Sequence, residues 1–311
     1  MIDISTKIAG VKLDGCVFNA SGVRDETLLD LENLAKSKSC AVLMKSCTLA
    51  PRKGNPAPRC VNLKYGSINS MGLPNLGYRA YIKFSKILEE KYQKPLIASI
   101  CGLSPKDNII MFKAFNDTPV DLIEFNPGSP NTIGKPIVGY DFEEMDRLLD
   151  SVSKVTKKPF GVKLPPYFDL THFEQMANII KKYPVKFVTC VNSIGNGLAI
   201  NPQTEKVLIK PKGGLGGIAG GYIKYTALAN VRMFYQLLAD KIQVIGVGGV
   251  YSGIDAFEMI LAGASAVQIG TAFLQKGPGI FARVQNQLSN FMKKKGYQNL
   301  ADFRGKLNTL D

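Results

Sequence analysis

Short apolar runs alternate with longer amphipathic stretches along almost the whole chain. The runs have the length of buried β-strands and lie at 17–20, 41–45, 96–100, 122–126, 161–164, 187–192, 244–246 and 266–269. Because they are apolar without alternation, they are typical of strands that are covered on both faces in a parallel sheet.

The stretches between these runs carry apolar residues at helical spacing. The sequence predicts helices over 26–38, 78–92, 105–116, 142–156, 170–182, 226–238, 254–262 and 278–295. A strand followed by a helix, repeated eight times, predicts an α/β fold of the (β/α)8 TIM-barrel class. The alternative is an open, doubly wound sheet. The near-regular repeat and the lack of a GxGxxG turn after the first strand disfavour it.

Two long insertions interrupt the repeat, at 47–77 after the second strand and at 193–225 after the sixth. No linker or low-complexity segment divides the chain, so residues 1–311 are expected to form a single barrel domain. Long loops inside a compact domain are usually functional, and both insertions are therefore candidate parts of a site.

Composition and charge narrow the class of protein. The chain is 45% hydrophobic, which suffices for a sizeable core, and no apolar run is long enough to cross a bilayer. The first residues lack the layout of a signal peptide, and the six cysteines show no metal-ligand spacing, so a soluble, cytoplasmic protein is expected. The single histidine, His172, excludes a histidine-rich metal site. The net charge of +14 is interpreted as a solvated basic surface and not as a nucleic-acid site, because no basic stretch is interleaved with aromatic residues.

Polar residues stand where several of the predicted strands end. The carboxyl ends of the strands form the site in barrels of this class. Here these ends carry Asn19-Ala20-Ser21-Gly22, Lys45-Ser46, Asn126, Lys163 and Asn192-Ser193. A polar group that is buried without a partner costs about 2–7 kcal/mol on transfer scales. The pattern therefore predicts a polar ligand at the mouth of the barrel.

Glycine-rich turns follow the last two strands, at Gly248-Gly249 and at Gly270-Thr271. This is the usual phosphate site of the fold, since glycines let backbone N–H groups approach the anion and a helix N-terminus favours its charge. Gly217, in the second insertion, is a further candidate for this phosphate site. The alternative is a pair of tight turns with no ligand.

Amide side chains indicate which kind of molecule binds beside the phosphate group. Asn69 lies in the first insertion, and Asn126, Asn131 and Asn192 follow the fourth and sixth strands. An amide donates and accepts hydrogen bonds, so it can bind a ring that bears carbonyl and N–H groups. No carboxylate pair or Ser/His/Asp set stands at these ends, which disfavours hydrolysis and favours redox chemistry carried by a cofactor.

The whole chain resembles the dihydroorotate dehydrogenases, in particular the soluble, fumarate-using class 1A. The most specific matches are NASGV at 19–23, KS at 45–46, GNPAPR at 54–59, GSINSMGLPN at 66–75, GVKLPPYFD at 161–169, VNSIGNGL at 191–198 and KPKGGLGGIAG at 210–220. The resemblance implies a homodimeric FMN enzyme of pyrimidine biosynthesis. Such an enzyme oxidises dihydroorotate to orotate and passes the electrons to fumarate.

The resemblance also implies roles for individual residues. Those implied to hold FMN are Ala20, Ser21, Gly22, Lys45, Ser46, Asn126, Lys163, Asn192, Gly217, Gly248, Gly249, Gly270 and Thr271. Those implied to hold the substrate are Lys45, Asn69, Met71, Gly72, Leu73, Asn126, Asn131, Asn192 and Ser193. Lys163 is expected near the pyrimidine edge of the flavin, where a cation stabilises the anionic reduced form. Lys45 and Ser129 are the expected catalytic residues.

Ser129 is the main departure from the family pattern. Class 1A enzymes carry Asn-Leu-Ser-Cys-Pro-Asn with the cysteine as base, whereas this chain reads Asn126-Pro127-Gly128-Ser129-Pro130-Asn131. A thiol has a pKa of about 8.5, but a hydroxyl is a far weaker acid and needs a partner or water chain to take its proton. Serine is the base in the membrane-attached class, so the change is compatible with the same reaction. A second departure is Tyr225, where the family often has proline.

The sequence leaves the consequence of this departure open. The enzyme oxidises dihydroorotate with a shifted pH optimum, or it is a paralogue for another small ring or ene substrate, or it binds flavin with little turnover. RNA-directed flavin reduction is a further alternative, disfavoured because no RNA-binding helical domain is visible. The electron acceptor and the rate are likewise not determined by the sequence.

Overall fold

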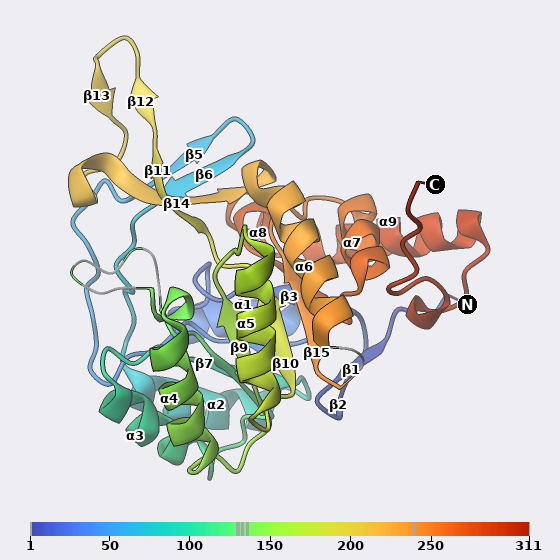
Figure 1. Ribbon diagram of the computed structural model, residues 1–311, viewed down its shortest axis with the longest axis horizontal. Helices are drawn as coiled ribbons and strands as arrows, with labels where there is room; N and C mark the ends of the chain where they lie inside the picture. Colours follow the sequence, from blue (N-terminus) through green and yellow to red (C-terminus); the bar gives the residue numbers. More distant parts are fainter. Residues whose placement is uncertain (1, 129–130, 132–133, 135–136, 239–240, 311) are drawn as a thin grey trace.

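The computed structural model describes residues 2–128, 131, 134, 137–238 and 241–310 (Figure 1). Within these residues, eight parallel strands form one sheet. Their order is β3 (Val17–Asn19), β16 (Ala266–Ile269), β15 (Gln243–Val247), β10 (Phe187–Cys190), β9 (Phe160–Leu164), β8 (Leu122–Phe125), β7 (Leu96–Ile100) and β4 (Val42–Leu43). The predicted (β/α)8 barrel is confirmed. The second and sixth strands are shorter than predicted.

A side chain joins the two ends of this sheet. The amide of Asn19 on β3 donates to the carbonyl of Leu43 on β4 at 2.7 Å and accepts from the Leu43 N–H at 3.0 Å. The Cys40 N–H adds a bond of 3.0 Å to the carbonyl of Val17. Asn19 was grouped with the polar residues expected to meet a ligand, but it is buried in the barrel wall and does not line the cavity described below. Its amide replaces the backbone pairing that would otherwise close the barrel.

Helices follow the strands and cover the outer face of the sheet (Figure 1). They are α1 (Leu28–Lys36), α2 (Tyr78–Lys91), α3 (Pro105–Phe115), α4 (Phe142–Ser153), α5 (Leu170–Lys181), α6 (Lys224–Leu238), α7 (Gly253–Ala262), α8 (Thr271–Lys276) and α9 (Gly279–Lys295). The sequence did not predict α8, which has only six residues. Short 3₁₀ helices are η1 (Val138–Tyr140), η2 (Pro211–Gly214), η3 (Gly221–Ile223) and η4 (Leu300–Asp302). Helix α1 begins later than predicted because Thr27 and Asp30 form a capping box at its start.

The two insertions pair with each other. An antiparallel sheet forms in the order β11 (Ile194–Leu198), β14 (Leu215–Gly220), β6 (Gly66–Asn69) and β5 (Cys60–Leu63). The hairpin of β12 (Ile200–Asn201) and β13 (Lys206–Val207) projects beyond it (Figure 1). The sequence predicted where the insertions lie but not this pairing, because strands so short and rich in glycine carry no alternating pattern. The sheet lies over the carboxyl ends of the barrel strands (Figure 1).

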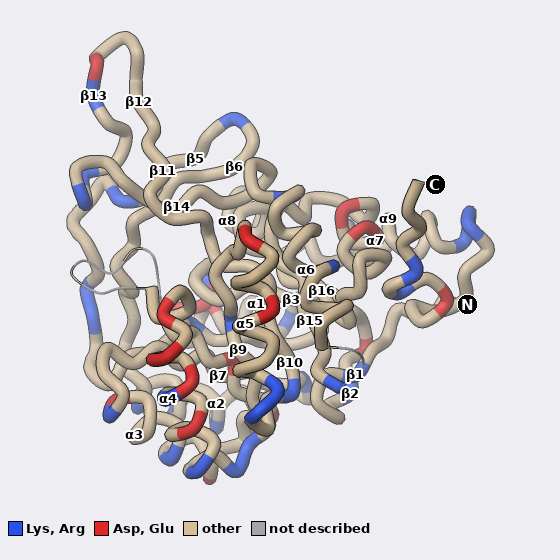
Figure 2. The backbone as a smooth tube through the Cα atoms, in the orientation of Figure 1, with Lys and Arg blue, Asp and Glu red and all other residues tan. Residues whose placement is uncertain are grey.

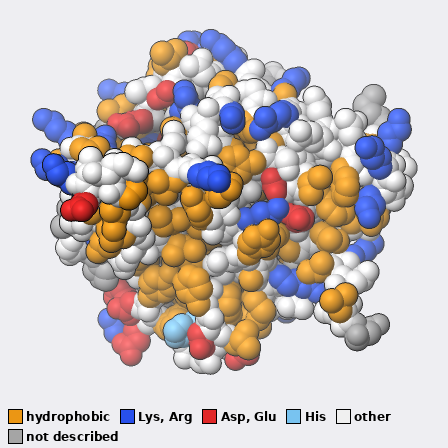
Figure 3. All heavy atoms as spheres, turned by 90° about the horizontal axis from the view of Figure 1, so that it is seen from above, with side chains coloured by type: hydrophobic (Ala, Val, Ile, Leu, Met, Phe, Trp, Pro, Cys, Tyr) orange, Lys and Arg blue, Asp and Glu red, His pale blue; other side chains and the backbone are white. Residues whose placement is uncertain are grey.

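Charged and apolar side chains are distributed differently over the surface. Lys and Arg are spread over many segments of the chain and are not gathered on one face (Figure 2). Hydrophobic side chains, in contrast, gather on the face seen from above in Figure 3. In the described part of the chain, no helix combines the length and the apolar character that crossing a membrane requires.

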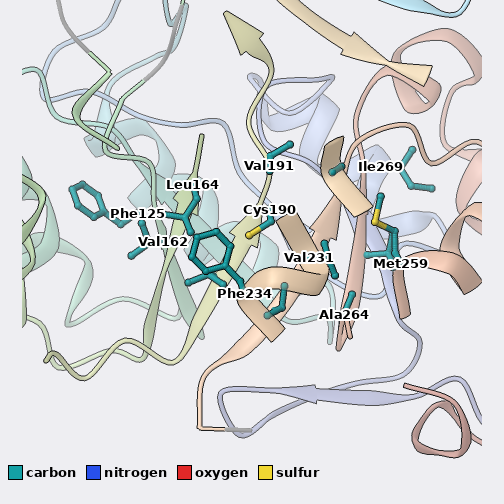
Figure 4. Packing of buried hydrophobic residues seen from close by; sticks show 14 of the residues in the cluster. Phe125, Val162, Leu164, Cys190, Val191, Val231, Phe234, Met259, Ala264 and Ile269 are labelled. Carbon is teal, nitrogen blue, oxygen red and sulfur yellow. The ribbon is translucent and has the colours of Figure 1, made fainter. Parts of the chain in front are cut away.

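The core has an outer and an inner part. The outer part lies between strands and helices and includes Phe125, Val162, Leu164, Val231 and Phe234 (Figure 4). The inner part lies inside the barrel and consists mainly of Phe18, Leu43, Ile97, Leu122, Phe187, Ile245 and Ala266. A hairpin of β1 (Thr6–Ile8) and β2 (Val11–Leu13) adds Ile8 and Leu13 to the inner part. A side chain at Gly161 would collide with the Phe187 ring, so that strand needs glycine at this level.

Replacing Asn19 by alanine tests the closure of the barrel. The change leaves the N–H and the carbonyl of Leu43 buried without these partners. We expect a loss of about 2–4 kcal/mol in the free energy of unfolding, measured by urea denaturation. Asn33→Ala, at an exposed position of α1, is the control and should change stability by less than about 0.5 kcal/mol. Equal stability of the two variants would show that the Asn19 amide does not hold the barrel closed.

Candidate active site

A cavity of about 420 Å³ lies at the carboxyl ends of the barrel strands, between the strand loops and the inserted sheet. Most residues that the sequence singled out lie around it. They are Ala20, Ser21, Gly22, Lys45, Ser46, Asn69, Met71, Leu73, Asn126, Asn131, Lys163, Asn192, Ser193, Gly248, Gly249, Gly270 and Thr271. The fold therefore brings together segments that are up to 251 positions apart, since Ala20 and Thr271 face the same space.

Two of the singled-out glycines, Gly72 and Gly217, do not line this cavity. Gly72 has a φ of +72°, and a side chain there would collide with Asn55. Gly217 donates its N–H to the Asn131 side chain at 3.2 Å, and a side chain there would collide with Ser193. Gly217 therefore lies against Asn131 and Ser193, which line the cavity, whereas Gly72 forms the turn between the lining residues Met71 and Leu73.

One corner of the cavity has the features of a phosphate site. Gly248 and Gly249 after β15 have φ values of +132° and +73°, which turn the backbone in a way that side-chain-bearing residues rarely adopt. Helix α8 begins after Gly270 with no side-chain cap, so its first N–H groups are available to an anion. A Cβ at Gly270 would meet no atom closer than the Ala20 side chain at 3.6 Å and would occupy space next to the cavity. These glycines fit a phosphate group.

Hydroxyl and amide groups line the rest of the cavity in two chains. Ser46 connects with Ser21 at 3.1 Å and with Ser99 at 2.8 Å, and it accepts from the Asn126 amide at 3.3 Å. On the side of the insertions, Asn131 donates to Asn69 at 2.7 Å. The β6–β14 ladder pairs Asn69 with Gly217, so the pairing of the insertions positions this amide. The arrangement presents donors and acceptors suited to a small polar ring.

Below the cavity, the inward side chains of the barrel become polar. Glu124, Thr189 and Gln268 are buried, Gln268 also lines the cavity, and none of the three was predicted from the sequence to hold the cofactor or the substrate. Each follows an inward apolar residue by two positions, as Lys45 follows Leu43. Because successive residues of a strand point to opposite faces, this spacing was the signal that identifies them. Burial lowers the pKa of Lys163 in this layer, and the charge of Glu124 opposes that shift.

Asp25 is a further residue that sequence reasoning missed. It lines the cavity and is only 1% exposed. Its Oδ2 accepts from the Gly22 N–H at 2.7 Å, while its Oδ1 is buried and has no hydrogen-bond partner among the described residues. Burial raises the pKa of this carboxyl to about 7, and the nearby Lys45 opposes the shift. Asp25 therefore changes its charge near neutral pH.

Ser129, the expected catalytic base, lies outside the described residues. Asn126 and Asn131 on either side of it line the cavity. Its catalytic role stays a prediction.

The fold and the cavity place the chain among (β/α)8 barrels with glycine-rich turns after their last two strands. The sequence profile of the dihydroorotate dehydrogenase family matches residues 3–292, and the chain belongs to this family. Members are FMN-dependent oxidoreductases that act on CH–CH bonds, and this protein is an enzyme of that kind.

Two relatives show how close the similarity is. The chain is 50% identical over 313 residues to a putative dihydroorotate dehydrogenase A (fumarate) from Streptococcus pyogenes, covering 100% of both chains. It is 50% identical over 310 residues to dihydroorotate dehydrogenase A (fumarate) from Lactococcus lactis, covering 99% of this chain and 100% of the relative. The ligand-free structure of an Eimeria tenella dihydroorotate dehydrogenase superimposes with a TM-score of 0.84 at 20% identity, over 98% of this chain and 91% of the other. At that identity the structural likeness supports the fold.

Replacing Asp25 by asparagine tests the buried carboxyl. Its pKa is 3.8 in an ordinary environment and about 7 here, so between these values the folded state binds one proton more than the unfolded state. Stability therefore falls as the pH rises toward 7, by about 1.4 kcal/mol for each unit. Between pH 5 and pH 8 this amounts to at most about 3 kcal/mol.

We expect Asp25→Asn to lack this loss. Its free energy of unfolding, relative to the original protein, should rise between pH 5 and pH 8 by up to about 3 kcal/mol in chemical denaturation. Asp117→Asn is the control, because the Asp117 side chain is 86% exposed. A difference between Asp25→Asn and the original protein that stays constant with pH would contradict a carboxyl that titrates near 7.

Proposed function

We propose that this protein oxidises dihydroorotate to orotate in pyrimidine biosynthesis and passes the electrons to fumarate, the acceptor in the names of its relatives. The observation that carries the proposal is the cavity, which joins a phosphate corner to a surface of lysines and amides. This combination suits a phosphorylated flavin with a small polar ring beside it.

The residues around the cavity divide into two groups by position. The glycine-rich corner of Gly248, Gly249, Gly270 and Thr271 would hold the phosphate of FMN. The flavin ring would lie along Ala20, Ser21, Gly22, Lys45, Ser46, Asn126, Lys163 and Asn192, with Gly217 behind Ser193. When bound, FMN supplies the acceptor for the hydrogen and electron pair that leave the substrate.

The substrate would lie on the side of the insertions. Asn69, Asn126, Asn131, Asn192 and Ser193 can pair with the carbonyl and N–H groups of the dihydropyrimidine ring. Lys45 would bind the carboxylate, and Met71 and Leu73 would pack on the ring, with Gly72 forming the turn between them. Lys45 is only 6% exposed, so its attraction for an anion is weakly screened by water.

Oxidation of a CH–CH bond to a double bond also removes a proton, and a group of the protein has to accept that proton. Ser129 is the proposed base, because it occupies the position of the cysteine in class 1A enzymes. A serine hydroxyl needs a group that accepts its proton in turn. Because Ser129 can act as the base only with such an acceptor, a second candidate function is the oxidation or reduction of another small ring in the same flavin site.

The proposal includes a homodimer in the cytoplasm. Six free cysteines fit a reducing compartment. Exposed hydrophobic side chains lie near the start of α5, on β11 to β13 and in the first turn of α6, namely Phe168, Leu170, Leu198, Ile200, Val207 and Tyr225. Figure 3 shows hydrophobic side chains gathered on one face of the molecule, and exposed hydrophobic patches are typical of subunit interfaces. Tyr225 stands at a helix start, where the proline of other family members is equally accommodated.

Substrate-driven reduction of the bound flavin tests the reaction. Anaerobic dihydroorotate should bleach the flavin absorbance in a stopped-flow experiment. Ser129→Ala should slow this reduction by about 100-fold or more and spare reoxidation by fumarate, since general-base contributions are typically of that size. Ser129→Cys should shift the pH profile of reduction downward, because a thiol ionises more easily than a hydroxyl. No bleaching at saturating dihydroorotate, while dithionite still reduces the flavin, would exclude dihydroorotate as the substrate.

Charge placed on the apolar face tests the dimer. Leu170 is 66% exposed at the start of α5, and Leu170→Glu should convert a dimer into a monomer in sedimentation velocity. Leu29→Glu is the matched control, because Leu29 is 65% exposed on α1, across the barrel from α5. If Leu170→Glu sediments like the original protein, another face forms the interface or the protein is a monomer.

A further inference from the structure

A chain of hydrogen bonds crosses the inside of the barrel at the floor of the cavity, and two of its members, Lys163 and Gln268, line the cavity. Lys163 on β9 donates from its Nζ to Oε1 of Gln268 on β16 at 2.8 Å. Gln268 donates from its Nε2 to Oε2 of Glu124 on β8 at 2.7 Å. The same Oε2 accepts from the Thr189 hydroxyl on β10 at 2.9 Å. All four side chains are at most 7% exposed.

The chemistry of the end groups fixes the direction of this chain. A lysine ammonium only donates and an ionised carboxylate only accepts, so the amide between them has its oxygen toward Lys163 and its nitrogen toward Glu124. The hydrogen bond to the carboxylate polarises the amide, and the amide oxygen therefore becomes a stronger acceptor for the ammonium. Glu124 thus stabilises a positive charge on Lys163 without touching it through a direct salt bridge.

We propose that Glu124 is a positioning residue that, through the Gln268 amide, keeps Lys163 charged and directed at the flavin site, and so sets the reduction potential of the cofactor. The proposal uses the FMN site of the proposed function but not its substrate. It concerns three side chains that come from different strands and meet only in the closed barrel.

Among the described groups near Lys163, Glu124 is the anion that stabilises the positive charge of the lysine. Burial alone favours neutral Lys163, and Glu124 from β8 opposes this. Cys190 from β10 also acts on Lys163, but burial raises the pKa of this thiol far above neutral pH, so it stays uncharged. Lys45 from the loop after β4 lines the same cavity and is itself a cation.

Removal of the Glu124 charge has two effects of opposite sign on a bound flavin. The loss of a negative charge nearby would by itself favour the reduced, anionic flavin and raise its potential. If Lys163 then loses its proton, the loss of that closer positive charge lowers the potential instead. The sign of the change therefore separates an action through Lys163 from a direct action of Glu124.

The test is the midpoint potential of FMN in Glu124→Gln holoenzyme between pH 6 and pH 9, by equilibration with a reference dye in the absence of dihydroorotate. Glutamine keeps the shape and can still accept from Thr189 and Gln268. We expect the potential to fall below that of the original protein, increasingly with pH, by about 30 mV for each tenfold change in the two-electron equilibrium. In a Lys163→Met background the same substitution should cause no fall.

Two further variants complete the experiment. Gln268→Met keeps the Glu124 carboxylate but removes the amide that bonds to both Glu124 and Lys163, so it should reproduce the pH-dependent fall of the midpoint potential. It also tests the proposal if Glu124→Gln does not fold. Thr189→Val removes a hydrogen bond to Glu124 without changing any charge and should leave the pH profile unaltered. An unchanged or raised potential in Glu124→Gln, or in Gln268→Met, overturns the proposal. Because no substrate is used, failure of dihydroorotate to react leaves this result intact.

Discussion

The inward side chains of the barrel fill two layers of opposite character. Where Leu122 and Phe187 point inward, the layer is apolar and closes the barrel as a packed core. Two residues further along the same strands, Glu124 and Thr189 point inward, and the layer is polar and charged. A strand advances by about 3.3 Å for each residue, so less than 7 Å separates the packed core from the floor of the cavity. Charged groups at that depth need partners, and the hydrogen bonds among them give the floor its shape.

The inserted segments complete the cavity from above. Each insertion contributes one antiparallel pair, β5 with β6 and β11 with β14, and the ladder between β6 and β14 joins the two pairs into one sheet. That ladder places Asn69 beside Gly217, and the Asn131 side chain bonds to both. The amides proposed to read the substrate ring are therefore held by contacts between segments that are far apart in the chain. The phosphate corner, in contrast, is built locally from two turns of the barrel itself.

The proposed base of this protein is Ser129, at the position where the class 1A pattern carries a cysteine. A serine at position 129 transfers a proton less readily than a cysteine. Around the cavity, two buried groups respond to their surroundings in opposite directions: burial raises the pKa of Asp25 and lowers that of Lys163, with Lys45 and Glu124 opposing the respective shifts. Both shifts reduce the charge that is buried, which is the general response of ionisable groups in a weakly polar interior.

The barrel class, the positions of its strands and the glycine-rich phosphate turns follow from the order of residues alone, because they rest on local periodicity and on turn chemistry. The lysines and amides at the strand ends could also be found this way, since each stands at the end of an apolar run. Asn19 could not be assigned, because an amide that closes the wall and one that meets a ligand look the same in the sequence. Glu124, Gln268 and Asp25 acquire their roles only when strands and loops distant in the chain meet. Tertiary structure decides such roles because a buried charge is defined by its partners, and these lie on other strands.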